Sequence, residues 1–402
     1  MKRFGWLLII LLAATPGWCA RKITVGQLED MLKTLHQQDK SDQEVADALK
    51  QVELTEELTR STMNSLVSLV PGPHSTEQVY VLEARSAMLA PPASDLPTTP
   101  APDTAAQKAI LDKAAGYVSK TYAQLPALTT TKTTARFQDN VEAAAPSSGM
   151  HGSARDVSTG SSFVDAYQFV HYINAAEAHV ASDHGAEQAS AEKDTTPWGA
   201  NSMNAIQEPD PSLGTVFQEA QDSGTIKWLR WELINGKPAA VFSFEVPKKK
   251  AHYPVDVCCF PNVDQAGKVT FTSASGFGAG QPGGTPGQAG GAKGNLQTNT
   301  SWHPYKANVS YHGELFIDPD SGTVVRMITQ ADLKASDVVH RDDERIEYGP
   351  ANVGDKSLTV PVRTITSLEV VPNGDSGSAG RYSVRNTYLI AEYKEYQASA
   401  GK

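Results

Sequence analysis

The chain has 402 residues, of which 40% are hydrophobic, 20% charged and 7% aromatic. This composition supports a packed core and excludes a wholly disordered chain, and the length suits two domains or one domain with appendages. The net charge is −10 at pH 7, from 35 Lys and Arg against 45 Asp and Glu. A general nucleic-acid binder needs a basic face for phosphates, so we expect no nucleic acid among the partners.

Residues 1–20 are predicted to be a secretory signal peptide. Lys2 and Arg3 precede an uncharged apolar run, GWLLIILLAA, which Pro16 and Gly17 end. The run is shorter than the roughly 20 residues that span a bilayer, so we expect no transmembrane span after cleavage. Retention as an anchor and lipidation of Cys19 are less favoured alternatives, the latter because PGW is a poor lipobox.

Removal of residues 1–20 changes the charge and the cysteine content. The segment carries two basic residues and no acidic ones, so the net charge becomes −12. Two adjacent cysteines remain, Cys258 and Cys259, and one vicinal pair cannot build a disulfide framework. The pair forms either a strained vicinal disulfide or, as we favour, two free thiols on opposite faces of a strand. The protein is expected to be secreted, in the periplasm or associated with an outer membrane.

Residues 21–90 are predicted to form a small helical bundle. Apolar residues recur at intervals of three and four, and each helix is too short to be stable alone. Three pairs of residues match the capping box at helix starts: Thr24 with Gln27, Ser41 with Glu44, and Ser75 with Gln78. Residues 91–103 then hold five prolines and are predicted to be an extended linker between two domains.

The second domain is predicted to cover residues 104–402. It begins with a helix over 104–120, capped by Thr104 with Gln107. Alternating, strand-like patterns follow over 127–138, 226–246, 311–330, 345–371 and 385–397, with turns at Asn235-Gly236, Asp318–Gly322 and Gly354-Asp355. Short connections without βαβ spacing predict an antiparallel meander. Two stretches interrupt it: a polar region over 139–212 with a candidate helix near 165–180, and a flexible glycine-rich loop over 273–300.

Three motifs are similar to known cofactor, catalytic or metal sites, but each is better explained as ordinary structure without a chemical role. Gly278, Gly280 and Gly283 match a dinucleotide-binding spacing, but no helix follows them. Residues 374–377, GDSG, are similar to a protease nucleophile loop but lack a matching histidine context and are also ordinary turn residues. The histidines 171, 179 and 184 lack convergent metal-ligand spacing. We therefore expect a protein that is not an enzyme, with no catalytic residues, no metal and no cofactor.

Two further features of the strands carry interpretations that bear on binding. Lys248-Lys249-Lys250 could meet anionic lipid headgroups, although a solvated turn is the favoured interpretation. Trp228 and Trp231 are three apart on a strand and are therefore predicted to face opposite sides of the sheet.

Several segments resemble a family of secreted, uncharacterised acidobacterial proteins. They are residues 206–261, which include IKWLRWEL and AVFSFEVPKKKAHYPVDVCCFP, residues 313–332 (GELFIDPDSGTVVRMITQAD) and residues 345–363 (RIEYGPANVGDKSLTVPVR). The helical start, through LTEELT and APPASDLPTTPAP, fits the same family. The resemblance covers nearly the whole mature chain and implies no known activity.

The C-terminal part is also similar in style to periplasmic lipoprotein carriers of the LolA/LppX type. In those carriers a capped helix precedes a curved antiparallel half-barrel, whose concave apolar face holds acyl chains. The helix at 104–120, the strands from Ala127 and the hairpin GELFIDPDSGTVVR, Gly313–Arg326, fit that order. The long insertions and the N-terminal helices depart from it, and the resemblance supplies no ligand motif.

The sequence thus predicts an α+β fold, with a small N-terminal helical bundle followed by a curved antiparallel sheet, a LolA-like half-barrel, that carries a helix and long loop insertions. The expected function is non-enzymatic binding of a hydrophobic or lipid-like ligand in the concavity of the sheet. The alternative is a protein–protein interaction scaffold of the cell envelope, with an envelope protein as partner. Six residues on predicted strands are candidates to line the ligand site: Trp228, Trp231, Phe242, Phe244, Phe316 and Met327.

Overall fold

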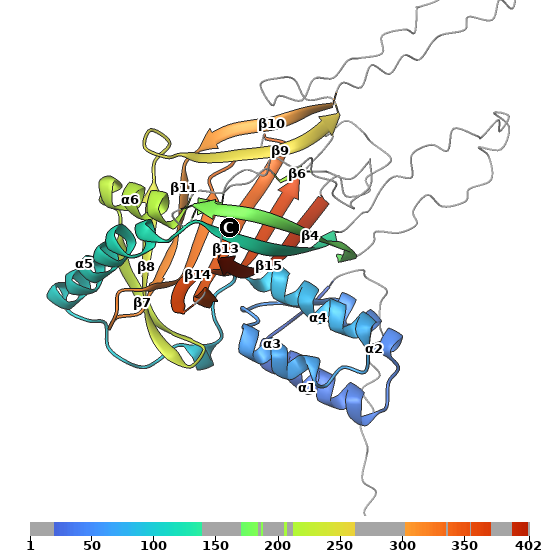
Figure 1. Ribbon diagram of the computed structural model, residues 1–402. Helices are drawn as coiled ribbons and strands as arrows, with labels where there is room; N and C mark the ends of the chain where they lie inside the picture. The colour runs from blue at the N-terminus through green and yellow to red at the C-terminus, as the bar shows by residue number, and fades with distance from the viewer. Residues whose placement is uncertain are drawn as a thin grey trace, which may run out of the picture.

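The computed structural model describes residues 20–138, 170–183, 186–187, 205–206, 212–261, 302–334, 337–353, 355–370 and 388–400. The fold is mixed α+β, with an open antiparallel sheet of ten strands between two groups of helices (Figure 1). Residues 1–19, the loop over 273–300 and the motifs at 278–283 and 374–377 lie outside the described residues. The predictions made for them therefore stay predictions.

Four helices and two short parallel strands form the N-terminal group. They are β1 (Arg21–Ile23), α1 (Val25–Gln37), α2 (Asp42–Lys50), β2 (Val52–Leu54), α3 (Arg60–Val67) and α4 (Pro73–Ser86). All six elements contribute to one buried apolar cluster. The capping boxes at Thr24 and Ser41 are confirmed, because in each the side chain and the backbone of the N-cap residue bond to the residue three positions on.

The capping box predicted at Ser75 is wrong, because α4 begins three residues earlier than a cap at Ser75 would require. Its N-cap is Gly72, and a carboxylate from another helix provides the cap. The Oδ2 of Asp42 accepts from the backbone N–H of His74 at 3.0 Å, and its Oδ1 accepts from that of Ser75 at 2.8 Å. A Cβ on Gly72 would lie 2.6 Å from Asp42 Oδ2, so glycine lets α2 and α4 approach.

The large sheet has the order β5-β4-β3-β15-β14-β13-β12-β11-β8-β7, and every neighbouring pair is antiparallel. Its strands are β3 (Leu128–Gln138), β4 (His171–Asp183), β5 (Ala186–Glu187), β7 (Lys227–Ile234), β8 (Lys237–Val246), β11 (Tyr311–Ile317), β12 (Val324–Ala331), β13 (Val339–Val353), β14 (Lys356–Val370) and β15 (Tyr388–Ala400). The five strand-like patterns are therefore confirmed. The turn at Asn235 and Gly236 has positive φ at both residues, as the Asn-Gly pair predicts.

The helix predicted near 165–180 is wrong, because residues 171–183 form strand β4. Its alanines and glutamate favour a helix locally, but β4 pairs with β3 along nearly its whole length. The ladder to β3 therefore overrides the local preference. A second, smaller sheet has the order β10-β9-β6 and consists of β6 (Ala205–Ile206), β9 (Tyr253–Pro261) and β10 (Trp302–Val309). Cys258 and Cys259 lie on β9.

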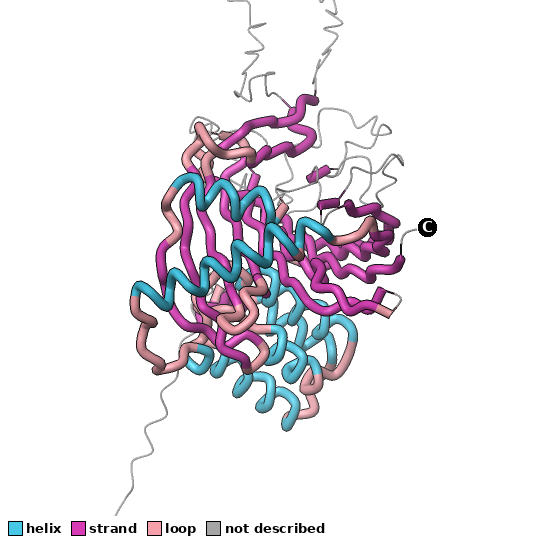
Figure 2. The backbone as a smooth tube through the Cα atoms, turned by 60° about the vertical axis from the view of Figure 1, so that its left-hand side comes forward, coloured by secondary structure: helices cyan, strands magenta, loops and turns pink. Residues whose placement is uncertain are grey.

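Helices α5 (Thr104–Lys120) and α6 (Leu213–Ser223) cover one face of the large sheet (Figure 2). The cap of α5 is Asp103, one residue before the predicted Thr104, and its Oδ1 accepts from the N–H of Ala106 at 2.8 Å. Sequence analysis did not predict α6, although its cap residue Ser212 and its left-handed final glycine, Gly224, are standard helix-end signals.

Two glycines of the hairpin between β11 and β12 allow close packing on this face. A Cβ on Gly313 would lie 1.9 Å from the carbonyl oxygen of Ile328 and 2.8 Å from the ring of Phe244. Gly322 has a φ of +77°, and a Cβ there would lie 2.5 Å from the backbone of Lys113 on α5. Lys113 Nζ in turn donates to the carbonyl of Pro319 at 2.9 Å. The hairpin turn therefore holds α5 in place.

We expect Gly322→Ala to lower the free energy of unfolding by about 2 kcal/mol or more, because alanine is strained at positive φ and its Cβ would displace α5. The measurement is urea unfolding followed by circular dichroism. The matched control is Gly116→Ala on α5, where an added Cβ has no neighbour within 4 Å. The control should be neutral or raise stability by up to about 1 kcal/mol. Equal effects of the two substitutions would contradict this account.

Candidate functional site

The six candidate lining residues fall into three places. Phe242, Phe244 and Met327 are buried in the apolar cluster beneath α5 and α6. Trp228 and Trp231 are half-buried at the margin of that cluster. Phe316 points to the opposite face, where it lies in a second cluster with Val241 and Ile328.

Trp228 and Trp231 lie on the same side of the sheet, which corrects the expectation that they face opposite sides. The register between β7 and β8 shifts between Trp228 and Arg230, so Leu229 is an extra residue in a β-bulge. The bulge turns Trp231 back toward Trp228, and the centroids of their rings are 5.0 Å apart at 71°. Strict alternation along a strand fails wherever such an extra residue enters.

A buried carboxylate fixes α6 to the sheet. Glu219 of α6 accepts hydrogen bonds from the hydroxyl of Tyr311 at 2.7 Å and from the backbone N–H of His252 at 3.1 Å. The ring Nδ1 of His252 lies 2.6 Å from Glu219 Oε1. Burial and the neighbouring Glu219 both raise the pKa of Tyr311, so its hydroxyl stays a hydrogen-bond donor. We call these three residues the α6 clamp.

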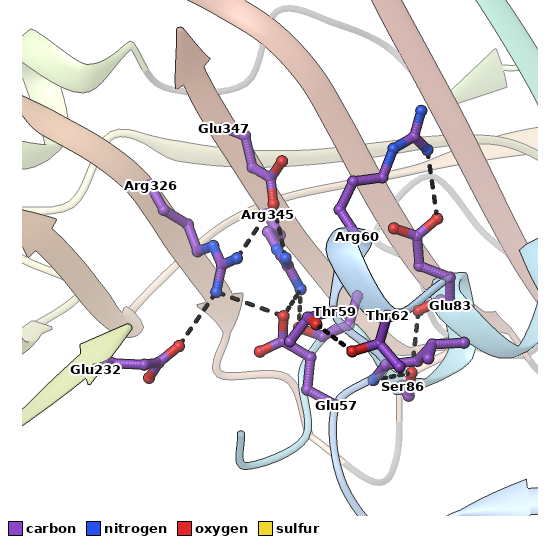
Figure 3. A network of polar contacts seen from close by, with 12 residues as sticks. Glu57, Thr59, Arg60, Thr62, Glu83, Ser86, Glu232, Arg326, Arg345 and Glu347 are labelled. Atoms are coloured by element: carbon purple, nitrogen blue, oxygen red, sulfur yellow. Dashed lines mark hydrogen bonds and ion pairs between the residues drawn. The ribbon is translucent and has the colours of Figure 1, made fainter. Parts of the chain in front are cut away.

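The opposite face of the sheet carries a continuous set of ion pairs, most of it buried, and Figure 3 shows part of it. Five arginines and five glutamates take part, and their formal charges cancel. We call this set the arginine–glutamate network, and its members are Arg60, Arg230, Arg326, Arg345, Arg363, Glu57, Glu83, Glu232, Glu314 and Glu347.

Glu347 on β13 is the centre of the network within the sheet. Its carboxylate lies 2.6 Å from Arg345 Nη2, 2.6 Å from Arg363 Nη2 and 3.3 Å from Arg326 Nη2. Strands β12, β13 and β14 are neighbours, so one carboxylate reaches an arginine on each of them. Three guanidinium groups therefore share one carboxylate at the centre of the sheet. Further carboxylates are required to balance the two remaining positive charges.

The N-terminal helices supply two of these anions. Glu57, which lies between β2 and α3, is 2.7 Å from Arg345 Nη1 and 3.4 Å from Arg326 Nη1. Glu83 of α4 forms an ion pair with Arg363, and its side chain has no solvent exposure. Arg345 also donates to the carbonyl of Ala87 at 3.2 Å. The charged contacts therefore join the N-terminal helices directly to the sheet.

Apolar contacts lie on one side of the junction between the N-terminal helices and the sheet. Val81 and Ala84 of α4 are buried against Phe137 of β3 and Ile365 of β14. At the other side the network continues to the edge of the sheet. There Arg230 lies 2.7 Å from Glu232 and 2.8 Å from Glu314, and the guanidinium of Arg326 stacks on Phe316 with 5.1 Å to the ring centroid.

Burial and neighbouring charge compete in setting the pKa values of the network. Burial alone would raise the pKa of Glu347, but Arg345, Arg363 and Arg326 hold it well below its ordinary value. Burial raises the pKa of Glu83 and of Glu232 by more than their arginine neighbours lower it. The central carboxylate is thus firmly ionised, whereas the two outer ones are held as anions less strongly.

The network links the N-terminal helices to the sheet through buried charges. Buried ion pairs contribute little net stability, but a buried charge left without its partner is costly. This cost favours the docking position in which Glu57 and Glu83 meet the arginines. Within the described ranges, no group of His, Cys, Asp and Glu side chains has the arrangement of a metal site.

Sequence analysis missed the network because its members look like the solvated face of an amphipathic strand. The signal was present in β13, where Arg345 and Glu347 alternate with Ile346 and Tyr348, so the strand has a charged face and an apolar face. Only the docking of residues far apart in the chain shows that the charged face is covered. Pattern alone cannot distinguish a charged face in water from one beneath another element.

No helix in the described part of the chain has the length and apolar character needed to cross a membrane. The chain matches no protein-family model, no curated protein and no solved structure.

We expect Arg345→Met to lower the free energy of unfolding by about 3–5 kcal/mol, because Glu57 and Glu347 would lose a buried counter-charge. Urea unfolding measures the loss. The matched control is Arg341→Met on the same strand, where the arginine side chain is 46% exposed and pairs with Asp343 at 3.7 Å, so the cost should be about 1 kcal/mol or less. Adding Glu57→Gln to Arg345→Met should restore part of the loss. A surface-like cost for Arg345→Met would contradict the network account.

Glu347 and Glu232 should change the pH dependence of stability in opposite directions, because folding lowers the pKa of the first and raises that of the second. The folded state lowers the pKa of Glu347, so this residue stabilises the protein above its unfolded pKa, and the contribution is lost as the pH falls. Glu347→Gln should therefore reduce the loss of stability between about pH 5 and pH 3. The folded state raises the pKa of Glu232 above its unfolded value, so this residue costs stability at neutral pH and costs less as the pH falls. Glu232→Gln should therefore make the loss of stability on acidification larger, and its effect should lie above about pH 4.5. Urea midpoints at several pH values test both signs, and the same sign for both variants would overturn the assignment.

Proposed function

We propose that the chain is a non-enzymatic secreted protein of the cell envelope, which binds an apolar or lipid-like ligand against the sheet face covered by α5 and α6. In this proposal the large sheet is a half-barrel of the LolA-like type and residues 21–90 are its helical bundle. The signal-peptide pattern of residues 1–20 supports the location. Burial of apolar ligand surface, at about 25 cal/mol per Å², would provide the affinity.

The observation that carries the proposal is the aromatic character of this one face. Phe242 and Phe244 lie in one cluster with Trp228 and Trp231 at its margin, and two helices are the cover. Both helices bury apolar side chains in this cluster, among them Phe217 of α6. Beyond these contacts, α5 has the tight contact at Gly322, whereas α6 has the polar α6 clamp. Movement of α6 would give an apolar ligand access to the aromatic side chains.

A second candidate function, a protein–protein interaction scaffold of the envelope, has its own support at the edge strand β7. Leu229, the bulged residue, is 44% exposed, and it lies between the two half-buried tryptophans. An exposed apolar side chain at a sheet edge favours contact with another polypeptide.

The test uses delipidated protein and a fluorescent fatty acid. The wild-type protein should bind the probe, and Glu219→Ala should speed its uptake and release about tenfold, because the α6 clamp loses its acceptor. The matched control is Glu83→Ala, which removes a buried carboxylate from the opposite face and should leave the exchange rates unchanged. Circular dichroism checks that both variants fold. Absence of probe binding, or equal effects of the two variants, would refute ligand binding at this face.

A further inference from the structure

The segment over residues 91–103 passes around one edge of the sheet. It leaves α4 on the face with the arginine–glutamate network and enters α5 on the opposite face. The edge strand is β7, which pairs only with β8 in the described sheet, and the segment runs close to it (Figure 1). We call residues 91–103 the strap, because they connect two faces by way of an edge.

After a short 3-10 turn over Ala93–Asp95, the strap has the sequence of a polyproline II ligand. Its five prolines fix φ near −65°, and the backbone is extended at both ends, with φ −63° and ψ 152° at Pro92 and φ −65° and ψ 168° at Asp103. Pro97 and Pro100 have the PxxP spacing. Such a segment loses little entropy on binding and presents its carbonyls outward, which suits recognition by aromatic side chains.

One such aromatic side chain, that of Trp231, contacts the strap in this protein. The indole N–H of Trp231 donates to the carbonyl oxygen of Pro100 at 2.9 Å. Trp228 packs edge-on against Trp231, and Phe242 packs edge-on against Trp228 with 5.5 Å between ring centroids. An indole donor on a proline carbonyl, beside a second aromatic ring, is the chemistry by which proline-rich segments are recognised. We call Trp228 and Trp231 the tryptophan platform.

The contact can open without disruption of the core. Pro100 and Ala101 are exposed, and Trp231 is only half-buried, whereas Phe242 beneath the platform is buried. A strap that merely connected α4 to α5 would need no aromatic platform at its midpoint. Because the strap belongs to the same chain, its effective concentration at the platform is high, and a second ligand binds only when the strap is displaced or weakened.

We propose that the tryptophan platform is a binding site for polyproline II segments, which the strap occupies within the chain and a proline-rich segment of another protein occupies when the strap is displaced. The partner is defined by its chemistry: an extended segment with PxxP spacing, whose carbonyl accepts from Trp231. This inference goes beyond the binding of an apolar ligand and does not depend on it. Covering of the platform by the strap also protects the edge strand from indiscriminate pairing.

The experiment weakens the strap in the full chain and supplies a ligand in trans. The variant carries Pro97→Gly, Pro100→Gly and Pro102→Gly, which remove the fixed φ values of the strap. The probe is a fluorescent synthetic peptide with the sequence of residues 95–103, DLPTTPAPD. Fluorescence anisotropy should show binding to the variant, and binding to the wild-type chain should be at least about tenfold weaker because the strap competes.

Two matched controls separate recognition from nonspecific contact. Adding Trp231→Phe to the triple variant should weaken peptide binding about fivefold, the equivalent of one neutral hydrogen bond. The same peptide with glycine in place of its prolines should not bind. Failure of the triple variant to bind the peptide, equal binding of the glycine peptide, or unchanged binding with Trp231→Phe would overturn the proposal.

A second measurement keeps the test decisive if the triple variant does not fold. In the otherwise unaltered chain, Trp231→Phe should increase hydrogen exchange in the strap, and Trp228→Phe, which keeps the indole donor of Trp231, should increase it less. Equal exchange in both variants and the wild-type chain would show that the platform does not hold the strap. Loss of peptide binding with retained fatty-acid binding would refute this inference and leave the proposed function standing.

Discussion

The rest of the structure depends on one electrostatic constraint, which is that charges placed under a helix must be compensated there. The strands present Arg326, Arg345 and Arg363 toward a face that the N-terminal helices cover. Water cannot solvate these groups once the helices dock, so the docking elements must bring carboxylates. Glu57 and Glu83 are those carboxylates, and their positions fix where the helices lie.

Different interactions therefore determine how helices pack on the two faces of the sheet. The face beneath α5 and α6 is apolar and relies on shape, with Gly313 and Gly322 as the points where a larger residue would not fit. The face beneath the N-terminal helices relies on charge pairing, with apolar contacts such as Val81 on Ile365 at one side. Apolar packing tolerates small shifts in register, whereas a buried ion pair does not, so the second face has the stricter specification.

Much of the fold could be predicted from local signals. The Asn235-Gly236 turn and the alternating strands that follow it needed only neighbouring residues to be recognised, and so did the capping boxes at Thr24 and Ser41. The predictions that were wrong concern elements whose structure depends on residues far away in the sequence. Asp42 caps a helix that begins thirty-one residues later, at Pro73, and β4 is a strand because β3 pairs with it.

The candidate sites show the same division. Sequence analysis selected aromatic residues on strands, and five of the six share one side of the sheet. It could not foresee that Leu229 is a bulge, which brings Trp228 and Trp231 together, nor that Phe316 belongs with the arginines. Two residues of the hairpin motif Gly313–Arg326 make contacts that explain their identity. Gly322 leaves room for the backbone of α5, and Arg326 forms an ion pair with Glu57 on the other face of the sheet.

The position of β15 has a consequence for the order of folding. This strand comes last among the described residues, yet it lies between β14 and β3, and β4 joins the sheet only through β3. Strands β3 and β4 therefore cannot join β14 and the strands beyond it until β15 is synthesised. Pairings between such distant segments close slowly, so the sheet stays incomplete until β15 has been synthesised and has paired with β3 and β14.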